Sequence, residues 1–67
     1  MSKQSESVEE LVWRSAAGDI DAQYALGMAL MEGKGVDQNR EKGMEWLKVA
    51  ATGGSQAAAV ALKQMGA

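Results

Sequence analysis

Apolar residues in the first half of the chain recur at three- and four-residue spacing, the period of an amphipathic α-helix. Ser7 and Glu10 have the spacing of a capping box, so we predict a first helix over residues 8–17. Gly18 can adopt the left-handed conformation that ends a helix. A new helix is therefore expected directly after this glycine.

Asp19 is a good N-cap for this second helix, which we predict over residues 20–32. Its apolar face consists of Ala22, Ala25, Leu26, Ala29 and Leu30. Since most of these side chains are small, close packing against neighbouring helices is expected. The two glycines of Gly33-Lys34-Gly35 favour a turn after this helix, with Val36 packed under the loop.

Two further helices are predicted in the second half of the chain. Either Asn39 or Asp37 can cap a third helix over residues 39–52, and Ser55 can cap a fourth over residues 56–65. The expected apolar contacts of the third helix are Met44, Trp46, Leu47, Val49 and Ala50 or Ala51. Those of the fourth are Ala58, Ala61, Leu62 and Met65.

The sequence also contains an internal echo. Displacing the chain by 36 positions aligns five pairs: Gly18 with Gly54, Asp19 with Ser55, Ala22 with Ala58, Ala25 with Ala61, and Leu26 with Leu62. A period in this range is typical of helical solenoids. The echo is imperfect, because Gly27 falls on Lys63 and because Trp13 aligns with Trp46 only at a different offset.

This ordered run of residues resembles the Sel-one-like repeat, a relative of the tetratricopeptide repeat whose unit is an antiparallel helix pair. The matching residues are Gly18, Ala22, Gln23, Tyr24, Leu26 and Gly27, then Gly33 to Val36, then Trp46, Leu47, Ala50 and Ala51, and finally Gly54, Ala58 and Leu62. The resemblance implies an all-α fold, a short α-solenoid (α-α superhelix) of about four helices. It also implies a scaffold or adaptor role, since such repeats commonly hold protein partners on a concave surface and share no catalytic residues.

Four positions depart from the pattern of this family. Gly43 stands where alanine is usual, Leu30 where an aromatic residue is usual, Asn39 where aspartate is usual, and Lys63 where glycine is usual. Gly43 should weaken the third helix by up to about 1 kcal/mol relative to alanine. The complete repeat is expected to be flanked by one helix on each side, which amounts to about one and a half units.

Composition and charge exclude several classes of function. The chain has no Cys and no His, so zinc sites and cysteine or histidine catalysis are not expected, and neither is any cofactor. The formal net charge of −2, with acidic and basic residues intermingled, argues against nucleic-acid binding. No apolar stretch is long enough to span a bilayer. We therefore expect a non-enzymatic, cytoplasmic protein.

A protein-binding face is predicted on the second helix. Asp21, Tyr24, Met28 and Met31 follow one another at three- and four-residue spacing, offset from the alanine-rich stripe. A tyrosine supplies a rigid contact and methionines an adaptable one. The alternative is that Tyr24 and Met28 pack inside the core. Trp13 and Trp46 are both expected to be packing residues between helices, because the chain has no Phe.

The leading hypothesis is a small adaptor or inhibitor that binds one larger protein through this face, together with the exposed flank of the fourth helix. The alternative is a homo-oligomeric building block, with a homodimer as the simplest form, which self-associates through uncapped solenoid ends. Residues 1–6 are expected to be disordered and residues 7–67 to form a single repeat domain.

Overall fold

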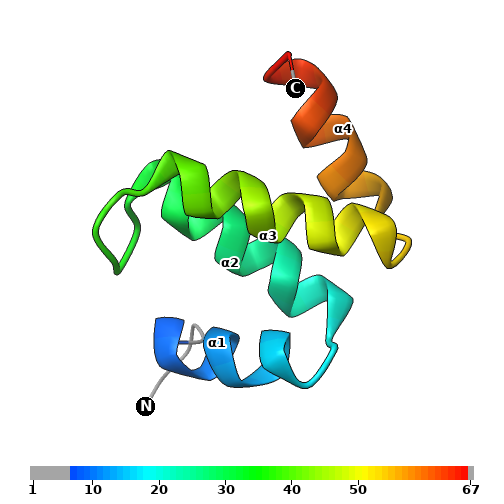
Figure 1. Cartoon of the computed structure of the whole chain (residues 1–67). Helices are drawn as coiled ribbons and strands as arrows, with labels where there is room; N and C mark the ends of the chain where they lie inside the picture. The colour runs from blue at the N-terminus through cyan, green and yellow to red at the C-terminus, as the bar shows by residue number, and fades with distance from the viewer. Residues whose placement is uncertain (1–6, 67) are drawn as a thin grey trace.

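The computed structural model describes residues 7–66, which form four α-helices joined by short connections (Figure 1). In chain order they are α1 (Val8–Ala16), α2 (Ile20–Glu32), α3 (Arg40–Thr52) and α4 (Gln56–Gln64). Each helix packs on the next one in the sequence, and the α2–α3 contact is the largest. The predicted all-α architecture of sequential helix pairs is confirmed. Residues 1–6, with their expected disorder, and Ala67 lie outside the described residues.

Each helix begins at a residue whose side chain accepts a hydrogen bond from a backbone N–H three positions further on. The four caps are Ser7, Asp19, Asn39 and Ser55, with donor–acceptor distances between 3.0 and 3.2 Å. The first N–H groups of a helix lack partners within the helix, so these side chains determine where each helix starts. Of the two candidates for α3, Asn39 is the cap, and Asp37 is exposed in the preceding loop.

The α1–α2 and α3–α4 connections have the same backbone geometry, and their corresponding residues are 36 positions apart in the sequence. Their left-handed glycines are Gly18, with φ 95°, and Gly54, with φ 112°. The Asp19 N–H donates to the carbonyl of Arg14, and the Ser55 N–H donates to the carbonyl of Ala50, both at 2.9 Å. Therefore α1 corresponds to the C-terminal part of α3, and α4 corresponds to the first part of α2. One complete helix pair is flanked by a helix on each side.

The core consists of two apolar clusters on opposite sides of α2. The first joins α1 to α2 through Leu11, Ala22, Leu26 and Leu30, with Val36 and Trp46 packed against it. The second joins α3 to α4 through Leu47, Ala50 and Ala58, all fully buried. The expected packing roles of Trp46 and Val36 are confirmed. Small side chains at these contacts let the helices approach closely, as the alanine-rich pattern predicts.

A close contact between helices involves two buried glycines at the α2–α3 crossing. A Cβ atom on Gly27 would lie 2.8 Å from Cγ of Leu47, and one on Gly43 would lie 2.8 Å from the Gly27 carbonyl oxygen. Neither position has room for a side chain. The close approach of α2 therefore explains why position 43 of this chain is a glycine and not the alanine usual in the family.

The packing role expected for Trp13 is wrong. Its side chain is 77% exposed, the most exposed of the large apolar residues described. The repeat of 36 positions accounts for this exposure, because Trp13 of α1 corresponds to Val49 of α3 and not to Trp46. Val49 is also exposed, at 47%, so its predicted apolar contact is wrong as well. This position of the repeat faces solvent in both α1 and α3.

Candidate protein-binding groove

An open groove runs between α2 and α4, and we call it the α2–α4 groove. It consists of two adjoining hollows of about 340 and 280 Å³, which share Met28, Ala61 and Gln64. The wall from α2 also includes Tyr24, Met31 and Glu32. The opposite wall also includes Gln56, Ala57 and Val60 of α4 and Met65 directly after this helix, and Arg40 of α3 lies at one end. The groove thus brings together side chains from three helices.

The α2 wall contains three of the four residues predicted to bind a partner. Tyr24, Met28 and Met31 are half-buried, and they pack against the Leu47–Ala50–Ala58 cluster while also lining the hollows. Tyr24 and Met28 therefore pack on the core and are also accessible from the groove, and their role in binding a partner stays a prediction. Asp21, the fourth predicted residue, is exposed one turn earlier in α2 and lines neither hollow.

The opposite wall comes from α4, and most of its residues are absent from the predicted site. Gln56, Val60 and Gln64 follow one another at four-residue spacing and form one row along the helix. Val60 is 52% exposed. The sequence signal for this row is the four-residue spacing itself, on the flank beside the Ala58–Leu62 core face. Its position opposite Tyr24 follows from the way α4 packs on α3, which the sequence pattern alone does not give.

The chemistry of the groove is apolar with a few polar groups. Methionine and alanine side chains supply adaptable apolar surface, while the amides of Gln56 and Gln64 can each donate and accept hydrogen bonds. At the Met31 end the lining includes one acidic residue, Glu32, and one basic residue, Arg40. Such a surface suits a protein segment with apolar side chains and an accessible backbone. Within residues 7–66, no group of three or more metal-binding side chains occurs.

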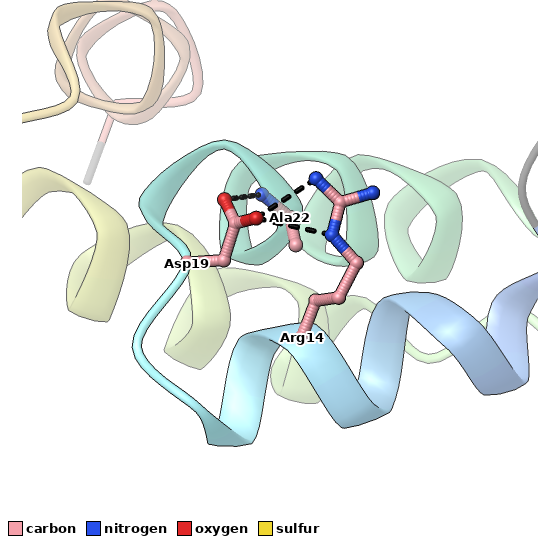
Figure 2. A network of polar contacts seen from close by, with 3 residues as sticks. All are labelled: Arg14, Asp19 and Ala22. Atoms are coloured by element: carbon pink, nitrogen blue, oxygen red, sulfur yellow. Dashed lines mark hydrogen bonds and ion pairs between the residues drawn. The ribbon is translucent and has the colours of Figure 1, made fainter.

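A polar contact outside the groove joins α1 to the start of α2 (Figure 2). Arg14 donates from Nε and Nη2 to Oδ2 of Asp19 at 3.0 and 2.8 Å, while Oδ1 accepts the N–H of Ala22 at 3.1 Å. The hydrogen bonds from Arg14, followed by the one from the Ala22 backbone, lower the pKa of Asp19. Asp19 is thus both a helix cap and an anchor for α1.

A family model for the Sel1 repeat matches residues 20–55, more than half of the 67-residue chain. The chain belongs to the Sel1 repeat family. The resemblance found in the sequence is confirmed. None of the curated proteins and none of the solved structures compared with the chain matches it.

The matched Sel1 repeat begins at the first residue of α2 and ends at Ser55, the cap of α4. It therefore contains the complete α2–α3 pair, and α1 and α4 flank it. Sel1 repeats generally mediate protein–protein interactions and are typically non-catalytic. Of the helices formed by residues 7–66, none combines the length and hydrophobicity needed to cross a bilayer. The α2–α4 groove is built from one helix of the Sel1 repeat and one flanking helix.

Proposed function

We propose that this chain is a small adaptor or inhibitor that binds one larger protein through the α2–α4 groove. The observation that carries the proposal is the alignment of Tyr24, Met28 and Met31 on α2 opposite Val60 and the two glutamines on α4. These residues form a continuous apolar surface bordered by amides. The surface lies where a Sel1 repeat and its neighbouring helix meet.

The size of the groove favours one partner over several. The groove consists of two adjoining hollows between α2 and α4, and together they make one short surface beside the single helix pair of the Sel1 repeat. A longer array would extend this surface with every added repeat. A single short groove suits the docking of one segment, as an adaptor or an inhibitor requires, better than the simultaneous binding of several proteins.

The exposed ends of the solenoid do not favour the alternative, self-association by continued stacking. In α3, Trp46 packs on the preceding cluster, but the equivalent residue of α1 is the exposed Glu10. In α2, Gly27 allows the close approach of α3, but the equivalent residue of α4 is the exposed Lys63. Light scattering over a range of concentrations tests this alternative, and a monomer throughout excludes it.

Affinity purification of tagged full-length chain from its native host, with quantitative mass spectrometry, tests the proposal. Val60→Lys places a charge in the groove without disturbing a buried side chain, and Val49→Lys is the matched control on α3. We expect one protein to be depleted at least about tenfold by Val60→Lys, the loss of about 1.4 kcal/mol. The same protein should be retained by Val49→Lys.

Truncations on the other wall complete the test. Tyr24→Ala and Met28→Ala should weaken recovery of the same protein while circular dichroism shows unchanged helicity. Equal recovery with Val60→Lys, Tyr24→Ala and the control variant would rule out the groove as the binding surface.

A further inference from the structure

The outer side of α1 carries a second exposed apolar surface, separate from the α2–α4 groove. Val8, Glu9, Val12 and Trp13 form two adjacent rows at four-residue spacing, and we call them the α1 face. Together with Ser7 and Gly35 they line a hollow of about 490 Å³. Gly35 belongs to the α2–α3 loop, and a Cβ atom on it would lie 3.3 Å from Cγ2 of Val8. The loop thus forms one wall of the hollow.

The fold does not require a tryptophan at this position. The equivalent residue of α3 is Val49, which is also exposed, so the repeat packs without an indole here. Trp13 nevertheless presents 77% of its surface to solvent, beside a valine that is 46% exposed. Exposed tryptophans in contact with other apolar groups are enriched at the energetic centres of protein interfaces.

The charges around the α1 face indicate the chemistry of its occupant. Glu9 lines the hollow, Glu10 is exposed beside it, and neither forms an ion pair within residues 7–66. Arg14, the basic residue of α1, is held by Asp19 at the start of α2 (Figure 2). Lys34 of the neighbouring loop forms an ion pair with Glu32, with 3.4 Å between Nζ and Oε1. Among residues 7–66, the side chains that line the hollow are one carboxylate, one indole, one serine hydroxyl and two valines, and none of them is basic.

We infer that the α1 face is a second docking surface, for a protein segment that presents an arginine or lysine next to an apolar side chain. The cation lies over the Trp13 indole, where the ring quadrupole attracts it, and within reach of the Glu9 carboxylate. The apolar side chain enters the hollow against Val8 and Val12. This site is independent of the α2–α4 groove, so either can fail its test while the other stands.

Nuclear magnetic resonance of the ¹⁵N-labelled full chain tests the inference with defined peptides. The probe is the capped tetrapeptide Leu-Arg-Leu-Arg, and the matched control replaces both arginines with citrulline, which is neutral and nearly isosteric. We expect saturable shifts of the Trp13 indole N–H and of the Val12 and Gly35 amides at millimolar peptide. The arginine peptide should bind about two- to fivefold more tightly than the citrulline peptide.

Two variants separate the contributions of the indole and the carboxylate. Trp13→Leu keeps an apolar side chain and should reduce the preference for arginine over citrulline to the part that the Glu9 carboxylate supplies. Glu9→Gln should weaken binding of the arginine peptide about two- to threefold, an effect that fades with added salt. Glu41→Gln removes an exposed carboxylate from the first turn of α3, as Glu9→Gln does in α1, and this control should change nothing.

Four results would overturn the inference. These are equal affinity for the two peptides, no saturable shift at Trp13, shifts centred on Tyr24 and Met28, or shifts of the α1 face that depend on protein concentration without peptide. The last result would assign the surface to a second copy of the chain.

Discussion

Gly27 of α2 and Gly43 of α3 meet backbone to backbone, such that a Cβ atom on Gly43 would lie 2.8 Å from the Gly27 carbonyl oxygen. This contact sets the separation of the one complete helix pair. A glycine inside a helix costs about 1 kcal/mol relative to alanine. Here that cost is offset by the close approach of two helices and by the burial of Leu47 between them.

Gly27→Ala should therefore destabilise the protein although alanine is the better helix former. The added methyl group would overlap Cγ and Cδ2 of Leu47 at 2.8 and 2.9 Å, and we expect a loss of about 1–3 kcal/mol. Urea unfolding followed by circular dichroism measures it. Gly53→Ala is the control, since its nearest neighbour is the end of the flexible Ile20 side chain, and it should cost less. A Gly27→Ala protein as stable as wild type would show that the crossing can open without penalty.

Ser15→Ala should leave stability unchanged or raise it by up to about 1 kcal/mol. The Ser15 hydroxyl is buried and finds no hydrogen-bond partner within the described residues, and the equivalent residue of α3 is Ala51. An unpaired buried hydroxyl is unfavourable, so its removal costs little.

The contrasting variant is Gln23→Ala, which removes the buried hydrogen bond from Nε2 to the Ser15 carbonyl at 3.0 Å. It should lower stability by about 1 kcal/mol in the same unfolding experiment. If Ser15→Ala proved the more damaging of the two, the hydroxyl would have a partner in solution.

The Arg14–Asp19 contact should make stability depend on acidity. Since folding lowers the pKa of Asp19 below its ordinary value of 3.8, ionised Asp19 stabilises the folded protein above that pH. This contribution is lost as the pH falls through the lower, folded-state pKa. Asp19→Asn keeps a capping oxygen but removes the charge, so the stability gap between wild type and Asp19→Asn should narrow on acidification. Urea titrations across this pH range measure the gap, and a constant gap would contradict the assignment.

The two tryptophans should behave differently on truncation. Trp13→Ala should change the unfolding free energy by less than about 0.5 kcal/mol, because the indole is largely exposed. Trp46→Ala should cost about 2 kcal/mol or more, because that side chain is half-buried against the first core cluster. Acrylamide quenching of each single-tryptophan variant provides a second check, with Trp13 the more accessible. Similar quenching of the two would place Trp13 in the core.

The helices and their order could be predicted from the sequence because the signals are local. A capping side chain three residues before its N–H partner, and a glycine in the left-handed conformation at each turn, specify where a helix starts and ends. The match between Gly18 and Gly54, 36 positions apart, likewise predicted the repeat from local sequence. Caps and turn glycines can be identified from neighbouring residues in the sequence, without knowledge of the tertiary contacts.

Trp13 and the α4 wall could not be predicted, because both depend on how helices are placed in three dimensions. Size alone suggested that Trp13 is buried, whereas Leu11 and Ser15 set the inward side of α1 and leave Trp13 outside. Likewise Val60 faces the α2–α4 groove only because α4 packs on α3 beside α2. For Gly43, the sequence showed the cost of the glycine but not the contact that requires it.

Site-specific photo-crosslinking tests the role of the α2–α4 groove most directly. The photoreactive residue p-benzoylphenylalanine replaces Val60 in one full-length protein and Val49 in another, and each is irradiated in the native host. The account predicts that position 60 yields one discrete crosslinked species, identified by mass spectrometry as a larger protein, and that position 49 does not. Crosslinking of that protein from position 49, or no species from position 60, would contradict it.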